Sequence, residues 1–210
     1  MIHRSGAVQT VVRVNPAVGN LWNRISLPSG EHRFELAEEA TPPMDSPLSE
    51  DEAQFSQDPL DVVEHVLEAE NLQFDRTERG DVAFTLSGGW RDFGLCFTWR
   101  PDVDCLQVSL SLDMRAPEGL RGQVFELLAG VNARASLGLF EMRDDGEILF
   151  RFGTPLLPGE YPGLGQTAGM IDVAMEAAER FFPAFDFLIR CGRPPAEALS
   201  ACMFETIGTA

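Results

Sequence analysis

The sequence contains no lysine, so arginine supplies all 16 basic residues among its 210 residues. Without lysine, the Gly-Lys-Ser/Thr ending of a phosphate-binding P-loop is absent. Histidine is also scarce, because two of the three histidines, His3 and His32, fall in a segment that we expect to be disordered. The folded region therefore offers no Ser/His/Asp or Cys/His set for nucleophilic catalysis, and we predict that the chain is not an enzyme.

Cysteine occurs four times, but never in the arrangement of a metal site. The sequence has no CxxC pair and no histidine close to Cys96, Cys105, Cys191 or Cys202. No apolar run approaches the roughly 20 residues of a membrane span, and polar residues interrupt the apolar stretch 7–14, unlike the core of a signal peptide. These absences predict a cytoplasmic protein with reduced thiols, no membrane partner and no cofactor.

Positive charge is lacking overall, since 33 acidic residues give a formal net charge of −17. Nucleic acids and anionic membranes need a basic patch on a protein that binds them, so we expect neither as a partner. The acidity is also uneven along the chain. Residues 1–43 hold four acids and four arginines, whereas residues 44–210 hold 29 acids and 12 arginines.

Proline and glycine interrupt residues 1–57 repeatedly, and acids gather in the last part of this segment. We predict a poorly ordered extension with an acidic linker over residues 1–57 and a folded domain over residues 58–210. A start codon at Met44 would remove the neutral part of the extension. This is a hypothesis that mass spectrometry of the native N-terminal peptide tests.

Four segments of the folded region carry the apolar spacing of helices. Asp58-Pro59, an N-cap followed by proline, predicts a helix to about Glu70. The spacing predicts a second helix over residues 121–134 and a long one over residues 168–191, which Pro183 should kink or interrupt. Pro195 begins a last predicted helix that reaches about residue 204.

Apolar residues alternate with polar ones over residues 82–86, 93–99 and 106–114, and the short turns between them predict an antiparallel meander. Leu72 and Phe74 suggest a further strand before it. Asp144-Asp145-Gly146 between two apolar runs predicts a hairpin. Helices that are apolar on one stripe need a partner layer. We therefore predict a two-layer α+β domain, in which a three-stranded meander plus the hairpin packs against helices.

The outward face of the predicted meander is polar, small and mostly uncharged, whereas a freely solvated face would more often carry arginine and glutamate. We select five residues of this face as a candidate partner-binding surface: Cys96, Thr98, Gln107, Ser109 and Ser111. An ordinary solvent face is the alternative. Cys96 and Cys105 share the face and would be near neighbours across strands, so a redox or metal role is a further alternative.

Gly163, Gly165 and Gly169 precede the long helix with GxGxxxG spacing rather than the dinucleotide-binding GxGxxG, and no strand leads directly into them. We interpret Thr154–Thr167 as a flexible loop. If the chain instead senses a small molecule or a nucleotide, this loop would be the lid of the site.

Several runs of residues resemble the YbjN family of bacterial proteins, which are described as regulators of sensory transduction. The most specific run is AERFFPAFDF at residues 178–187. The resemblance extends from about Asp58 to the C-terminus, but Cys191-Gly192-Arg193 stands where a Gly-Gly-Lys-like turn is expected. The other runs that carry it are Gly89-Trp90, Phe97–Trp99, Leu127–Arg134, Leu137–Phe140, Phe150–Phe152, Glu197–Leu199 and Thr206–Ala210.

The resemblance implies a fold similar to that of type III secretion chaperones, which are small, acidic and often homodimeric proteins that bind extended segments of clients. It also implies a non-enzymatic regulator or chaperone-like adaptor in stress or sensory signalling. Its partner would be a protein client, a signalling protein or a second copy of the chain. That partner would bind the exposed sheet face or a strand edge, and a domain that senses a small molecule or nucleotide is the alternative.

Overall fold

The computed structural model describes residues 58–202. The predicted disorder of residues 1–57, the hypothesis about Met44 and the last residues of the final predicted helix lie outside this range. The elements follow in the order α1 (Pro59–Ala69), β1 (Phe74–Arg76), β2 (Val82–Ser87), β3 (Asp92–Arg100), β4 (Cys105–Arg115), η3 (Glu118–Leu120), α2 (Arg121–Asn132), β5 (Leu139–Met142), β6 (Glu147–Pro155), α3 (Leu164–Cys191) and α4 (Pro195–Ala201).

The strands form a six-stranded antiparallel sheet in the order β1-β2-β3-β4-β6-β5. The predicted α+β class is therefore confirmed. The structure also shows how the meander and the hairpin pair within one sheet. β1 extends the meander to four strands, and the hairpin joins it because β6 pairs with β4. The hairpin turns at Asp144–Gly146, as predicted, with Gly146 at a φ of 86° that suits glycine.

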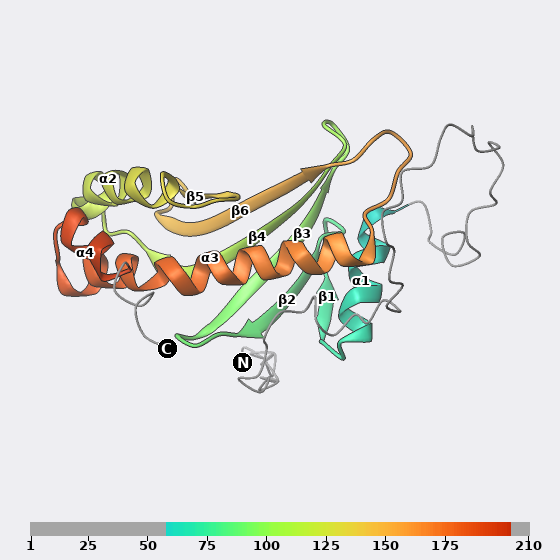
Figure 1. Ribbon diagram of the computed structural model, residues 1–210, viewed down its shortest axis with the longest axis horizontal. Helices are drawn as coiled ribbons and strands as arrows, with labels where there is room; N and C mark the ends of the chain where they lie inside the picture. The colour runs from blue at the N-terminus through green and yellow to red at the C-terminus, as the bar shows by residue number, and fades with distance from the viewer. Residues whose placement is uncertain (1–57, 203–210) are drawn as a thin grey trace, which may run out of the picture.

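The apolar rows of β2, β3 and β4 point to the helical layer. Figure 1 shows α3 lying across the sheet, with α1 near its beginning and α2 and α4 near its end. Because side chains alternate along a strand, one row in register across four strands is Phe84, Leu95, Leu110 and Phe150. These four side chains are buried in the core under the helices. The opposite face carries no helix of the described chain.

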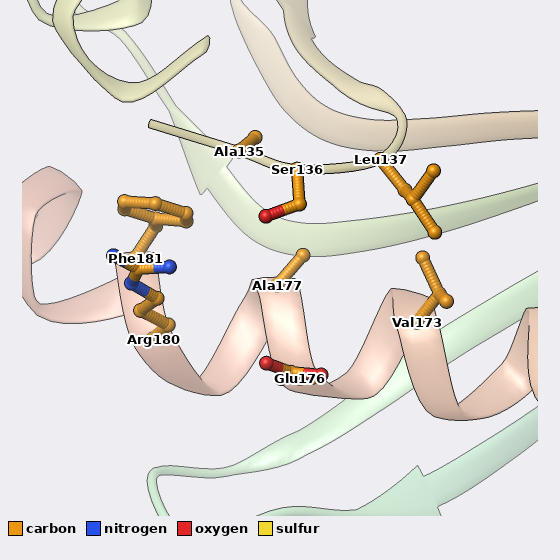
Figure 2. A pocket seen from close by; sticks show the side chains of 8 residues that line it. All are labelled: Ala135, Ser136, Leu137, Val173, Glu176, Ala177, Arg180 and Phe181. Atoms are coloured by element: carbon orange, nitrogen blue, oxygen red, sulfur yellow. The ribbon is translucent and has the colours of Figure 1, made fainter. Parts of the chain in front are cut away.

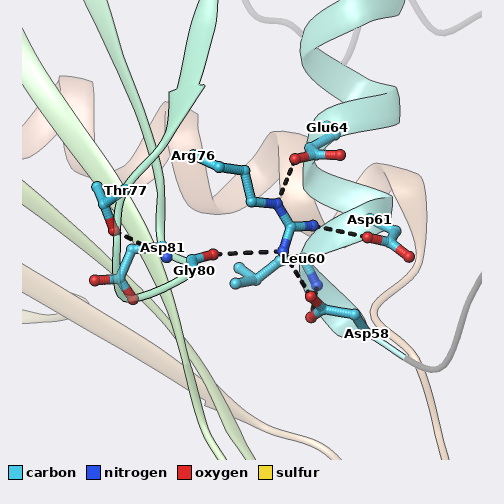
Figure 3. Close-up of polar contacts among 8 residues, drawn as sticks. All are labelled: Asp58, Leu60, Asp61, Glu64, Arg76, Thr77, Gly80 and Asp81. Atoms are coloured by element: carbon cyan, nitrogen blue, oxygen red, sulfur yellow. Dashed lines mark hydrogen bonds and ion pairs between the residues drawn. The ribbon is translucent and has the colours of Figure 1, made fainter.

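Arg76 ties β1 to the first helix (Figure 3). Its guanidinium donates to Asp58 at 2.7 Å, to Asp61 at 2.7 Å and to Glu64 at 2.5 Å. The carboxylates of Glu64 and Asp58 raise the pKa of Arg76 above its ordinary value. Asp58 also caps the helix as predicted, since its Oδ1 accepts from the N–H of Leu60 at 2.9 Å.

The turn between β2 and β3 is attached to α3 by one glutamate. Gly89 donates its N–H to Glu179 Oε1 at 2.6 Å, and Trp90 donates its indole Nε1–H to the backbone carbonyl of Glu179 at 3.0 Å. The Trp90 ring also stacks on Phe182, with ring centroids 6.2 Å apart. This contact joins two of the runs that carry the family resemblance, Gly89-Trp90 and residues 178–187, about 90 positions apart in the sequence.

Of the two predicted effects of Pro183, a kink or an interruption, the interruption is wrong, because α3 continues through this proline to Cys191. Proline lacks the N–H that would bond to the carbonyl four residues earlier, which is that of Glu179. Trp90 supplies a donor to that carbonyl from outside the helix. The missing helical hydrogen bond is thus replaced by a tertiary one, and the helix does not need to end.

The predicted loop Thr154–Thr167 is shorter than expected. β6 extends to Pro155, because it pairs with β4 as far as Cys105, and α3 begins at Leu164. Gly163 is the extended residue before the helix, and its N–H reaches the side-chain Oε1 of Gln166 at 3.4 Å. The glycines at 163 and 165 therefore belong to a helix start.

Candidate functional site

The candidate site is the helix-free side of the sheet, which we call the open face. The strand registers fix which residues share it. Eight positions on the meander strands β2 to β4 are uncharged and small or polar, whereas charged side chains of this face lie at the ends of these strands and on β1, β6 and β5. The eight positions are Ala83, Thr85, Gly94, Cys96, Thr98, Gln107, Ser109 and Ser111.

The five residues selected from the sequence lie together on this face. Cys96 is directly opposite Ser109, and Thr98 is opposite Gln107, on the neighbouring strands β3 and β4. Ser111 continues the row along β4. All five are half-buried, and the Ser109 hydroxyl donates to the carbonyl of Cys96 at 3.3 Å. The structure therefore shows one contiguous patch; its binding role stays a prediction.

One margin of the open face carries an ion pair. Arg151 of β6 sits opposite Ser109 and pairs with Glu141 of β5. The Nε–H of Arg151 is buried and has no hydrogen-bond acceptor among the described residues. A buried donor without an acceptor costs free energy.

The expectation that Cys96 and Cys105 are near neighbours across strands is wrong. Cys105 is opposite Arg100, four residues from Cys96 along β3. That offset corresponds to about 13 Å along a strand, whereas the Cα atoms of a disulfide lie less than about 7 Å apart. Burial raises the pKa of both thiols, which opposes formation of the reactive thiolate. Across residues 58–202 no group of three or more potential metal ligands is found.

The outer edge of β5 is less accessible than the open face. Asn132 at the end of α2 donates its Nδ2–H to the carbonyl of Phe140 at 2.9 Å, and its Oδ1 accepts the N–H of Phe140 at 2.8 Å. These are the backbone groups that an added strand would use. The other edge strand, β1, has only three residues. Both devices protect sheet edges from pairing with other chains. The pairing of Asn132 could not be read from sequence spacing.

A second concave feature lies on the helical side (Figure 2). It is lined by Ala135, Ser136, Leu137, Val173, Glu176, Ala177, Arg180 and Phe181, and its cavity volume is about 70 Å³. Small-molecule sites usually enclose about 300–1,000 Å³. None of its lining residues belongs to the Thr154–Thr167 segment, the lid in the alternative small-molecule reading.

Comparison with known proteins places this fold in a family. The YbjN family model, described as "Putative bacterial sensory transduction regulator", matches residues 59–187. The chain belongs to the YbjN family. The matched range begins at the first residue of α1 and ends inside α3, at the last residue of the AERFFPAFDF run, so it includes the whole sheet.

Among solved structures, one similar to this YbjN-family chain is titled "Crystal structure of YbjN, a putative transcription regulator from E. coli". It has 14% sequence identity and a TM-score of 0.44, and the alignment covers 57% of this chain and 85% of that one. No significant match was found among curated proteins. Within residues 58–202, no helix has the length and apolar character needed to cross a bilayer.

Proposed function

We propose that this YbjN-family chain is a non-enzymatic regulator that acts by binding another protein, and that the open face is its binding surface. The observation that carries the proposal is the uncharged centre of this face in a chain of net charge −17. Cores of protein interfaces are depleted of charged residues, whereas ordinary surfaces are not. A face whose centre carries no charge, in so acidic a chain, is therefore better explained by contact than by solvation.

The shape of the open face supports the same proposal. Gly94 has no side chain and open space where a Cβ would be, and Ser109 and Ser111 have short side chains, so a partner backbone can approach the sheet closely. Addition of a partner strand at the β5 edge is less favoured, since Asn132 already occupies the backbone groups of Phe140.

The biological setting follows from the family and from the fold that it resembles. A cytoplasmic adaptor in sensory or stress signalling, similar in action to a type III secretion chaperone, would bind an extended segment of a client protein. A second copy of the chain is the other candidate partner. Both partners are compatible with an uncharged face, and an acidic chain also favours a client with basic flanks.

The alternative is a sensor of a small molecule or nucleotide, with residues of Thr154–Thr167 as its lid. It is favoured by the exposure of Leu157 (66%) and Tyr161 (41%), which leaves apolar surface in that segment. A thermal-shift screen distinguishes it from the adaptor, because a ligand at 100 times its dissociation constant stabilises the fold by about 2.7 kcal/mol.

The test introduces charge at the centre of the open face. Gln107→Arg with Ser109→Arg should abolish capture of the partner from the native host after a salt wash. Gln123→Arg with Ser200→Arg makes the same chemical changes at exposed positions of α2 and α4, and should leave capture unchanged. If both double variants retain the same partner, the open face is not the binding surface.

Native thiols give a second, independent measurement. Cys96 and Cys105 lie on the open face, whereas Cys191 is exposed at the end of α3. Bound partner should slow the alkylation of Cys96 and Cys105 and leave that of Cys191 unchanged. Equal rates with and without the partner, in a complex that stays intact, would exclude contact with this face.

A further inference from the structure

The side of α3 that faces away from the sheet presents a row of four residues to the surface. Figure 1 shows α3 lying over the sheet as the outer layer of the described chain. The four residues are Gly169, Glu176, Arg180 and Phe187, and they follow one another at intervals of seven, four and seven. At 3.6 residues per turn they lie within about 40° of one another around the helix axis. Gly169 is half-buried and the other three are exposed, Phe187 by 42%. We call this row the outer stripe.

The two charged residues of the outer stripe have no counter-ion within residues 58–202. Glu176 and Arg180 are four residues apart, a spacing at which opposite charges can pair along a helix. Neither takes part in any of the ion pairs of the described chain. Instead, the guanidinium carbon of Arg180 lies 4.9 Å from the centroid of the Phe181 ring, away from the Glu176 carboxylate (Figure 2). The stripe therefore offers one negative and one positive charge to another surface.

The outer stripe is complementary to itself when its direction is reversed. Glu176 and Arg180 lie two residues on either side of Ala178, and Gly169 and Phe187 lie nine residues on either side of it. When a two-fold axis relates two antiparallel copies of a helix, each residue faces the one at the same distance beyond the axis. With the axis at the level of Ala178, Glu176 faces Arg180 of the second copy, and this pair occurs twice. Phe187 faces Gly169 of the second copy, so the exposed ring meets a position without a side chain.

We propose that two copies of the chain associate through their outer stripes, with the two α3 helices antiparallel. Charge complementarity selects a second copy as the occupant, because a partner surface of one sign would be repelled by either Glu176 or Arg180. Helices that cross at about 20° stay in contact over the roughly 27 Å from Gly169 to Phe187. Leu137, which is 52% exposed beside Val173 (Figure 2), borders the stripe and adds apolar area to the contact.

This dimer leaves the open face of each copy accessible, because α3 covers the other side of the sheet (Figure 1). One assembly would therefore present two open faces to a client. The inference goes beyond the proposed function and stands apart from its test. Charge reversal on α3 is measured by oligomeric state, whereas Gln107→Arg with Ser109→Arg is measured by capture of a partner.

The test measures the mass of the full-length chain by size-exclusion chromatography with light scattering, in reducing buffer at about 0.15 M salt, where repulsion between the acidic chains is screened. The wild-type chain should dimerise as its concentration rises. Glu176→Arg or Arg180→Glu alone replaces both attractive pairs by repulsive ones, so each should raise the dimer dissociation constant by roughly tenfold or more. The matched controls Arg193→Glu and Glu197→Arg make the same changes in an exposed pair with the same spacing, and should leave the constant unchanged.

Two combinations should restore the dimer. A chain with both Glu176→Arg and Arg180→Glu again places opposite charges against each other, with their positions exchanged. An equimolar mixture of the two single variants should form a heterodimer, because one copy then presents two arginines and the other two glutamates. Recovery in the mixture also shows that both single variants are folded. Phe187→Ser should weaken the dimer without a change of charge.

Three results would overturn the proposal. If the wild-type chain stays monomeric up to millimolar concentration, the stripe does not bind a second copy, and loss of partner capture by Glu176→Arg would then assign the stripe to that partner. If the chain dimerises but neither charge reversal weakens the dimer more than the controls do, the copies meet through another surface. If the single variants are monomeric and their mixture is too, Glu176 does not face Arg180 of the second copy.

Discussion

Replacing Trp90 by phenylalanine removes one hydrogen-bond donor while keeping an aromatic ring next to Phe182. The donor matters because Pro183 has no N–H for the carbonyl of Glu179, and the Trp90 indole donates to that carbonyl at 3.0 Å. The hydrogen bond contributes about 0.5–1.5 kcal/mol to the free energy of unfolding. The smaller ring also loses some apolar contact, although Trp90 is already 46% exposed. We therefore expect Trp90→Phe to destabilise the fold by about 1–2 kcal/mol.

A double-mutant cycle separates the hydrogen bond from the ring contact. Pro183→Ala restores an N–H at position 183, which can donate to the carbonyl of Glu179 as in a regular helix. In that background Trp90→Phe loses the ring contact alone, so its cost should fall by about 1 kcal/mol. Pro183→Ala alone has two opposing effects on stability, a gain in helix propensity and a loss of buried contact.

The assay is urea unfolding of the four proteins followed by far-ultraviolet circular dichroism, because the Trp90 substitution changes the fluorescence signal itself. The coupling energy comes from the four free energies of unfolding extrapolated to water. Additive effects of the two substitutions, within about 0.3 kcal/mol, would refute the idea that Trp90 replaces the hydrogen bond that Pro183 cannot make.

Three further outcomes are expected from other contacts. Asn132→Ala should lower the free energy of unfolding by about 1–2 kcal/mol, because two hydrogen bonds to Phe140 are lost and a small gain in helix propensity offsets part of the cost; an unchanged urea midpoint would contradict this. Arg76→Met should destabilise the fold at low salt by about 1 kcal/mol, and the difference should shrink near 1 M NaCl, where exposed ion pairs are screened. Burial raises the pKa of Cys96 above its ordinary value of 9.0, so the folded state favours the neutral thiol and loses stability as pH rises above about 9. Cys96→Ser should therefore flatten the fall in stability above that pH, and a parallel fall in both proteins would contradict it.

Local patterns in the sequence were enough to predict much of the domain. The Asp58-Pro59 cap, the alternation along β2 to β4 and the turn at Asp144–Gly146 each act within a few residues, and the structure shows all of them. The same alternation selected five residues that lie together on the open face. Each of these features depends on backbone preferences and on the side to which neighbouring residues point.

The remaining features depend on residues that are distant in the sequence. Pairing of β6 with β4, which extends β6 to Pro155, required knowing which strand the hairpin would join. The continuation of α3 through Pro183 depends on a tryptophan from another element, and the pairing of Asn132 with Phe140 depends on how α2 packs against β5. Side-chain spacing within one segment carries no information about such contacts. The separation of Cys96 from Cys105 depended on the strand register, which a turn of uncertain length left open.

The order of the strands has a consequence for the chain as it leaves the ribosome. β4 is complete at Arg115, but its sheet neighbour β6 begins only at Glu147. Until β6 is synthesised, β4 is the edge strand of an incomplete sheet. Its apolar side chains, from Leu106 to Met114, stay uncovered until α3 is synthesised. Nascent chains with uncovered apolar surface and unpaired strands aggregate or recruit chaperones. Translation that stops before Leu164 should therefore yield an aggregating fragment instead of a smaller stable domain.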